Sequence, residues 1–279
     1  MMDAVGIQSS DELFAKVPSK VFNTATLDLP DHQPEFMVEA TMKKLAGKNR
    51  VAGDGPFFVG AGAYRHHVPA TVDHLIQRSE FLTAYTPYQP EISQGTLQML
   101  FEFQTQVANL TGMEIANASM YDGSTATVEA VLMARRLKRR KGVVMSGGLH
   151  PQYRDTVATY MGDDEAFNCL PADPTAEEDI ISQIDDTTAC VVVQSPDFYG
   201  NLRDLRPIAE AAHEKGALLV AVFTEVVSLG AIESPGAQGA DIVVGEGQSI
   251  GNPLTFGGPY VGLMATRPNL VRQMPGRVC

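Results

Sequence analysis

The feature that most constrains this chain is an alternation of short apolar runs with longer amphipathic segments, which begins near residue 114. Only a few turn residues join each pair, which is the pattern of βαβ units in a largely parallel sheet. Strands are predicted at residues 115–119, 143–146, 167–170, 189–194, 217–222, 241–244 and 259–265. The helices between them are predicted at residues 124–140, 151–161, 176–184, 203–215 and 267–273. The sequence therefore predicts an α/β fold with a mostly parallel central sheet.

The residues before this alternation predict separate helices joined by irregular segments. Helices are expected at residues 11–16, 35–45, 69–78 and 96–111, from apolar residues at helical spacing and from capping residues and prolines. Residues 86–95 contain two prolines, and this segment is predicted to be extended because a residue before proline avoids the α region. We therefore divide the chain into an N-terminal helical arm, residues 1–68, and a large domain, residues 69–279.

The composition argues against several classes of function. The chain has 279 residues, of which 44% are apolar, so it can bury a sizeable core. Its net charge of −12 disfavours binding to nucleic acid or to anionic membranes. It contains neither a run of about 18 apolar residues nor a secretory signal pattern, so we expect a cytoplasmic protein. The spacing of the three cysteines fits neither a disulfide framework nor a zinc site, and no metal site is expected.

The clearest local motif is Tyr-Asp-Gly-Ser-Thr-Ala-Thr at residues 121–127, between a predicted strand and a long predicted helix. Small side chains let the backbone approach an anion, and a helix N-terminus supplies free N–H groups. Gly123, Ser124 and Thr125 are therefore candidates for a phosphate-binding turn. An ordinary helix cap explains the same residues equally well, because Ser and Thr are favoured at caps. The motif matches neither the Walker loop nor the dinucleotide-binding fingerprint.

His150 occupies a second junction between a predicted strand and a predicted helix. Ligands of open α/β sheets gather at this edge, so the imidazole is a candidate site residue. A structural role in capping or packing is equally compatible with its position.

The distribution of lysines sets this chain apart from a self-sufficient lysine enzyme. Pyridoxal phosphate needs a lysine for its Schiff base and a helix N-terminus for its phosphate. None of the eight lysines stands at the end of a strand in residues 241–265, where the Gly-rich loop instead presents Gln248 and Ser249. The chain therefore has the scaffold expected for such a cofactor but no covalent anchor.

Several motifs resemble the glycine decarboxylase (P-protein) family of the glycine cleavage system, and specifically its N-terminal half. The first is Thr-Pro-Tyr-Gln-Pro-Glu-Ile-Ser-Gln-Gly at residues 86–95. The others are Ser-Asp-Glu-Leu-Phe at 10–14, Gly-Ala-Gly-Ala-Tyr at 60–64, Asn-Ala-Ser-Met-Tyr-Asp-Gly at 117–123, His-Pro-Gln-Tyr at 150–153, Gly-Glu-Gly-Gln-Ser at 245–249, Phe-Gly-Gly-Pro-Tyr at 256–260 and Arg-Gln-Met-Pro-Gly-Arg at 272–277. The resemblance thus extends from about residue 10 to the end of the chain.

The resemblance implies the large domain of a type I pyridoxal-phosphate-dependent transferase fold. It also implies an α2β2 assembly in which a homologous beta subunit carries the cofactor on its lysine, while Gln248 stands at the matching position here. An amide cannot form the Schiff base, so this chain alone is expected to be inactive. The implied reaction is decarboxylation of glycine on pyridoxal phosphate, followed by transfer of the aminomethyl group to the lipoyl arm of H-protein.

Within such an assembly, the proline-stiffened segment and the strand–helix junctions are the expected contributors to a shared site. The candidates are Tyr85, Tyr88, Gln89, Glu91, Ser93 and His150. The turn at Gly123, Ser124 and Thr125 is expected to be the vestige of a phosphate-binding turn. The alternative for the proline-rich segment is that it only routes the chain over its own domain.

Two features depart from the family pattern. Phe223 follows a predicted strand where active enzymes of this fold place an aspartate against the pyridine nitrogen, which further weakens cofactor binding by this chain. The chain also ends where relatives continue into a small C-terminal domain, which is therefore expected to be missing.

Two alternative functions stay open from the sequence. One is a truncated, non-catalytic scaffold or binding protein of the same fold, and the other is an independent pyridoxal-phosphate lyase.

Overall fold

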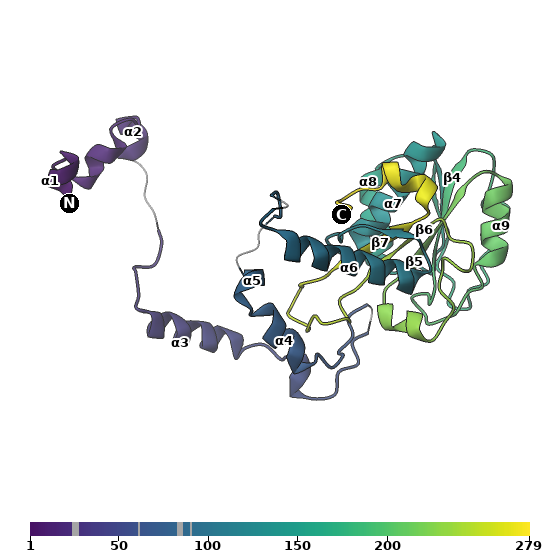
Figure 1. Ribbon diagram of the computed structural model, residues 1–279, viewed down its shortest axis with the longest axis horizontal. Helices are drawn as coiled ribbons and strands as arrows, with labels where there is room; N and C mark the ends of the chain where they lie inside the picture. Colours follow the sequence, from purple (N-terminus) through teal and green to yellow (C-terminus); the bar gives the residue numbers. More distant parts are fainter. Residues whose placement is uncertain (24–27, 61, 83–85, 90) are drawn as a thin grey trace. The chain divides into compact units, whose positions relative to one another are not determined.

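The computed structural model describes residues 1–23, 28–60, 62–82, 86–89 and 91–279, which form two compact units, Met1–Asp54 and Gly55–Cys279 (Figure 1). The first unit contains α1 (Met2–Val5), η1 (Ser10–Phe14), α2 (Ser19–Phe22), α3 (Glu35–Ala46) and η2 (Ala52–Asp54). The helix expected at residues 35–45 is confirmed as α3, whereas the one expected at 11–16 is the 3₁₀ helix η1. The proposed arm of residues 1–68 and domain of residues 69–279 stay a prediction.

The second unit is built on a seven-stranded sheet. Its strands are β1 (Ile115–Ala116), β2 (Gly142–Met145), β3 (Phe167–Cys169), β4 (Thr188–Gln194), β5 (Leu218–Phe223), β6 (Ile242–Glu246) and β7 (Gly262–Thr266). Their spatial order is β1-β7-β6-β5-β4-β2-β3, and the pairs from β3 through β6 are parallel. Only β7 and β1 run antiparallel to their neighbours. The predicted α/β fold with a mostly parallel sheet is confirmed.

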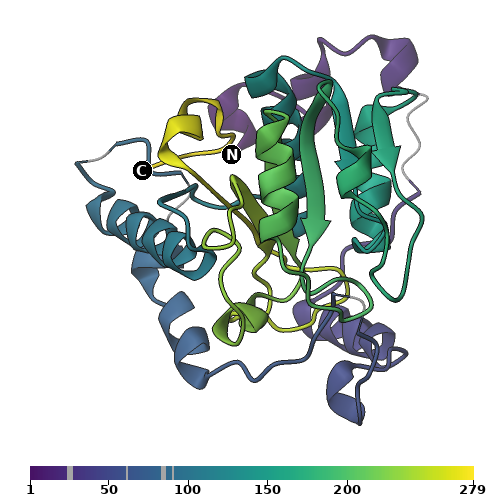
Figure 2. The ribbon, with the colours of Figure 1, turned by 90° about the vertical axis from the view of Figure 1, so that its right-hand side faces the viewer.

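Helices cover both faces of this sheet, which explains why its strands are nearly continuous apolar runs. The helices of this unit are α4 (Ala70–Ile76), α5 (Ser79–Leu82), α6 (Gln94–Thr111), α7 (Gly123–Lys138), α8 (Pro151–Met161) and α9 (Arg206–Glu214), with 3₁₀ turns η3 (Ile181–Gln183), η4 (Val226–Gly230) and η5 (Pro268–Gln273). Figure 2 shows α9, in green, lying on the face of the sheet toward the viewer.

Alternate strand residues enter two different cores. Val191 and Val193 of β4 pack with side chains of α6 and α9, whereas Cys190 and Val192 pack with side chains of α7 and α8. This follows from the two-residue period of a strand, which sends successive side chains to opposite faces. The two layers of helices therefore fix the sheet on both sides, and α7 and α8 share one face.

The α-helix predicted at residues 176–184 is wrong, because that segment contains only the short η3. The Asp173 carboxylate accepts hydrogen bonds from the backbone N–H of Thr175 (2.9 Å) and of Glu177 (3.0 Å). Ala176 then adopts a φ of 57°, which no regular right-handed helix allows. A local turn closed by Asp173 thus forms where the sequence predicted the start of a helix.

The prediction that residues 86–95 are extended is wrong at the end of this range. Helix α6 begins at Gln94, two residues before the expected start, and Ser93 is its N-cap residue. Among the described residues, none of the helices has the length and apolar character that a membrane crossing requires.

Candidate functional site

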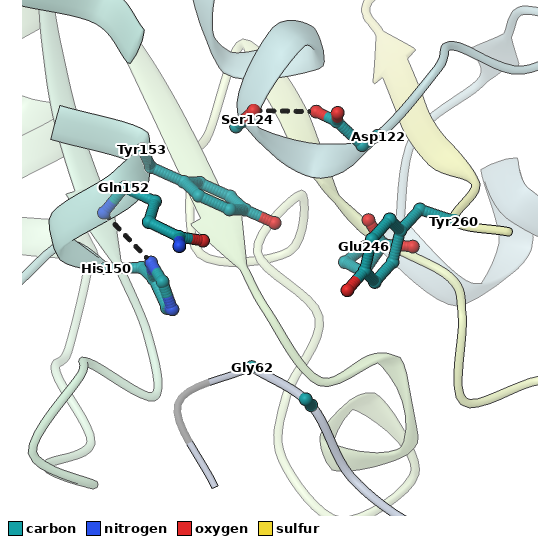
Figure 3. Close-up of a pocket in the computed structure, with 9 residues that line it drawn as sticks. Gly62, Asp122, Ser124, His150, Gln152, Tyr153, Glu246 and Tyr260 are labelled. Atoms are coloured by element: carbon teal, nitrogen blue, oxygen red, sulfur yellow. Dashed lines mark hydrogen bonds between the residues drawn. The ribbon is translucent and has the colours of Figure 1, made fainter. Parts of the chain in front are cut away.

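A pocket opens at the carboxyl ends of the central strands, where the starts of α7 and α8 converge (Figure 3). Its volume is about 120 Å³. Its nine lining residues are Gly62, Ala63, Asp122, Ser124, His150, Gln152, Tyr153, Glu246 and Tyr260. They come from the loop before α4, the first turns of α7 and α8, the end of β6 and the approach to β7. This is the edge at which α/β folds bind small ligands.

The first turn of α7 is capped from within the chain. Asp122 is the N-cap residue, and its carboxylate accepts from the backbone N–H of Thr125 (2.7 Å) and from the hydroxyl of Ser124 (2.7 Å). The Thr125 hydroxyl in turn accepts from the Asp122 backbone N–H (3.3 Å), which completes a capping box. Ser124 lines the pocket, but its hydroxyl hydrogen is directed to Asp122 rather than to the cavity.

Glu246 provides the second carboxyl group at this helix start. Its Oε2 accepts from the Gly123 backbone N–H (3.0 Å), and its Oε1 accepts from the backbone N–H groups of Gln248 (3.0 Å) and Val261 (2.9 Å). The residue is 5% exposed. Burial raises the pKa of the Glu246 carboxyl, the three backbone N–H groups pull it down, and the Asp122 charge adds to the increase.

Tyr153 lies directly beside this pair of carboxyl groups. A Cβ atom added to Gly123 would lie 2.0 Å from the Tyr153 hydroxyl oxygen, so the helix start and the phenol are in close contact. Burial, reinforced by the charges of Glu246 and Asp122, raises the pKa of the Tyr153 phenol well above its usual value. The phenol therefore stays protonated and presents a hydroxyl group to the pocket.

His150 combines the two roles that its sequence position left open. Its Nδ1 accepts from the Gln152 backbone N–H (3.2 Å), which caps α8, and its ring lines the pocket. The ring packs against Tyr153 and against the edge of Phe198, both at centroid distances of 5.3 Å. A Cβ on Gly62 would lie 3.3 Å from the imidazole, so the loop before α4 covers the ring closely.

Gln248 lies outside the pocket lining. Its side chain is buried, with 3% of the residue exposed, and its amide donates to the backbone carbonyl of Asn252 (2.5 Å). The amide oxygen is buried without a hydrogen-bond partner. In the described part of the chain, no lysine is among the residues that line the pocket.

Phe223 ends β5 and is fully buried. A Cβ on Gly245 of the neighbouring strand would lie 2.5 Å from the Phe223 ring, so the ring is pressed against the backbone of β6. An aromatic hydrocarbon at this strand end cannot form an ion pair with a pyridine nitrogen.

The residues expected to share a site occupy separate places. Tyr85 lies outside the described residues. Tyr88, Gln89 and Glu91 are exposed, and Tyr88 is 79% exposed. Glu91 borders a groove of about 530 Å³ along α6 with Phe101 and Arg277. Of the predicted shared-site residues, the structure places His150 in the pocket described above, whereas the segment before α6 borders a different groove.

The sequence predictions did not include several pocket residues, of which Glu246 is the most informative. A usable signal was present, because Glu246 is an acid at the end of a buried strand, between two glycines. Tyr153 and Asp122 lie within motifs that were recognised, but neither was singled out. No group of three or more His, Cys, Asp or Glu side chains suited to a metal ion occurs among the residues that the structure describes.

The fold and the pocket define this chain as an α/β protein of the type I pyridoxal-phosphate-dependent transferase fold, with a carboxyl-lined pocket. Two solved structures share its architecture. The crystal structure of glycine decarboxylase (P-protein) of the glycine cleavage system, in inhibitor-bound form, matches with a TM-score of 0.91, 48% identity and coverage of 100% of this chain and 62% of that chain. A sphingosine-1-phosphate lyase from Burkholderia pseudomallei matches with a TM-score of 0.63 at 16% identity, covering 92% of this chain and 64% of that chain.

The family description "Glycine cleavage system P-protein" matches residues 1–279, and the chain belongs to this family. Probable glycine dehydrogenase (decarboxylating) subunit 1 of Xanthobacter autotrophicus is 68% identical, with 100% of this chain and 63% of the relative covered. The protein of the same name from Caulobacter vibrioides is 61% identical, with coverage of 100% and 62%. The chain thus spans less than two thirds of the length of these curated relatives.

Proposed function

We propose that this chain is the non-lysine alpha subunit of a glycine decarboxylase. A homologous beta subunit in an α2β2 assembly would bind pyridoxal phosphate through its lysine. The pair would decarboxylate glycine and pass the aminomethyl group to the lipoyl arm of H-protein. Membership of the P-protein family and the similarity to proteins named subunit 1 support this proposal.

The observation that carries the division of labour is the environment of Gln248. At the position matched to the Schiff-base lysine, the chain has a buried amide that hydrogen-bonds the Asn252 carbonyl. The side chain at this position carries no primary amine. The pocket residues also do not fit the cofactor, because Asp122 and Glu246 already accept from two of the helix N–H groups that its phosphate would need.

The experiment is to produce this chain and the beta subunit together and to measure glycine–bicarbonate exchange with lipoylated H-protein. Each subunit alone should be inactive and the pair active. Borohydride reduction followed by mass spectrometry of each chain then locates the cofactor, which should be attached to the beta subunit. Cofactor attached to this chain would contradict the proposal and favour the independent lyase. A stable complex without exchange activity would favour the non-catalytic scaffold.

The proline-rich segment gives a second test of the shared site. Tyr88 is 79% exposed, so its ring is available to a partner. Tyr88→Ala should lower the exchange activity of the assembled pair at least tenfold, a loss of about 1.4 kcal/mol in transition-state stabilisation. The matched control is Arg139→Ala, at the exposed C-cap of α7, which should change activity little. If the two substitutions lowered the exchange activity equally, Tyr88 would not be part of the shared site.

A further inference from the structure

The start of α7 has the backbone geometry that α/β proteins use to hold a phosphate. The helix has 16 residues and follows the bridge at Met120, and its first turn faces the pocket. A helix N-terminus of this kind offers N–H groups and a partial positive charge to an anion. The question is which groups those N–H donors bind in this chain.

Two of these donors, the N–H groups of Gly123 and Thr125, bind carboxyl groups of the chain itself. Thr125 donates to its own N-cap residue Asp122, as in an ordinary capped helix. Gly123 donates instead to Glu246, which lies 123 residues further along the sequence. A capping box supplies no such long-range acceptor, so the Gly123–Glu246 bond is a separate feature of this fold.

Three segments hold Glu246 in place. Its two oxygens accept from Gly123 at the start of α7, from Gln248 in the loop after β6 and from Val261 before β7. The residue is 5% exposed, and the exposed part of its side chain borders the pocket. Rotation of the carboxyl group out of this position would leave three buried backbone donors unpaired, which is costly.

We infer that Glu246 is an internal acceptor that occupies the position of an external phosphate at the start of α7. A phosphate oxygen that accepts from Gly123 would have to lie where the Glu246 Oε2 atom lies. The carboxyl groups of Asp122 and Glu246 would also repel the incoming anion. Glu246 therefore determines that this pocket rejects phosphorylated ligands, whether or not a Schiff-base lysine is present. This exclusion is a property of this chain alone, so it holds or fails separately from the proposed glycine decarboxylase activity.

The test is whether removal of the side chain creates a phosphate site. The full chain carrying Glu246→Ala is melted in increasing inorganic phosphate at constant pH and in sodium chloride of the same ionic strength. Because a ligand that binds only the folded state raises the melting temperature, phosphate should raise the Tm of the variant by about 2–4 °C more than chloride does. The wild-type chain should show only the smaller stabilisation that phosphate, as a salt excluded from the protein surface, gives to folded proteins in general.

The matched control is Asp185→Ala. Asp185 also accepts a backbone N–H bond, from Thr187 at 2.8 Å, but it lies in the turn before β4 and not at a helix start. This variant should lose stability without gaining a response specific to phosphate. A phosphate response of Glu246→Ala no larger than that of Asp185→Ala would overturn the inference. The inference would also be overturned if phosphate raised the Tm of the wild-type chain, relative to chloride, as much as it raises the Tm of Glu246→Ala.

A second variant covers the case in which Glu246→Ala does not fold. Glu246→Ser vacates most of the same space and carries the same expectation. If neither variant folds in chloride, both are refolded in phosphate and in chloride of equal ionic strength. Recovery of the folded chain in phosphate alone supports the internal-acceptor role, and failure in both salts contradicts it.

Discussion

The close contact between Gly123 and Tyr153 predicts how much stability the chain loses when a side chain is added at residue 123. A Cβ at residue 123 would lie 2.0 Å from the hydroxyl oxygen and 2.8 Å from Cζ of Tyr153, and 3.0 Å from the carbonyl carbon of Gly245. These distances are shorter than van der Waals contact, so Gly123→Ala must displace the phenol or the helix start. We expect the substitution to destabilise the chain.

The expected change in the free energy of unfolding has two destabilising contributions and a third that offsets them in part. Overpacking of a well-filled region typically costs about 1–3 kcal/mol. Displacement of the helix start would also weaken the 3.0 Å bond from Gly123 to Glu246, which is worth about 1 kcal/mol. The higher helix propensity of alanine offsets roughly 0.5–1 kcal/mol of this loss. The net loss is therefore about 1–3 kcal/mol, with a lower Tm.

The assay is a double-mutant cycle with Tyr153→Phe, followed by urea denaturation of all four chains. Removing the hydroxyl leaves the 2.8 Å approach to Cζ, so the second substitution should relieve part of the clash. Gly123→Ala should therefore cost about 1 kcal/mol less in the Tyr153→Phe background. A difference below about 0.5 kcal/mol would refute the steric argument. Gly95→Ala, in the first turn of α6 with nothing within 4 Å of the added Cβ, is the control and should be neutral or slightly stabilising.

Three further predictions concern buried groups. The pKa of Glu246 is raised in the folded state, so the free energy of unfolding should fall as pH increases from about 4.5 through that raised value, by up to about 1.4 kcal/mol per pH unit. Glu246→Gln should remove this loss of stability. Identical pH profiles of Tm for the two chains would contradict the prediction. Glu178→Ala should lower the free energy of unfolding, measured by urea denaturation, by about 3–5 kcal/mol. The reason is that the guanidinium of Arg203, whose side chain is 9% exposed, loses its carboxylate partner. A loss below about 1 kcal/mol would show that the pair is not effectively buried. Burial raises the pKa of the Cys190 thiol to about 12, so iodoacetamide should modify exposed Cys279 in the folded chain and reach Cys190 only after unfolding, which peptide mass spectrometry would detect.

The strands illustrate what periodicity can predict. All seven expected strands are present, because each is a short apolar run bounded by turn residues, and burial on both faces leaves little choice of structure. The segment at residues 176–184 shows the opposite case. Thr175, just before it, and the acids in its first turn fit a helix start by local rules. The Asp173 carboxylate nevertheless closes a turn that only the folded backbone reveals.

The candidate site was predicted in part. The sequence located the two strand–helix junctions, and both Ser124 and His150 line the pocket. It did not reveal that the segment before α6 borders another groove, because the path of a proline-rich segment depends on what it packs against. Nor did it indicate that Tyr153 would lie against Gly123, since that contact depends on how closely α7 and α8 pack.

The sequence by itself determined the α/β architecture, the family and the absence of a lysine where Gln248 stands, because these depend on local pattern and residue identity. Only the tertiary structure decided what the start of α7 binds. The acceptor of the Gly123 N–H group is Glu246, 123 residues away, and the two meet because β6 and α7 are brought together by the order of strands in the sheet. A hydrogen bond between residues so distant in the chain leaves no periodic trace in the sequence, so it could be found only in the folded protein.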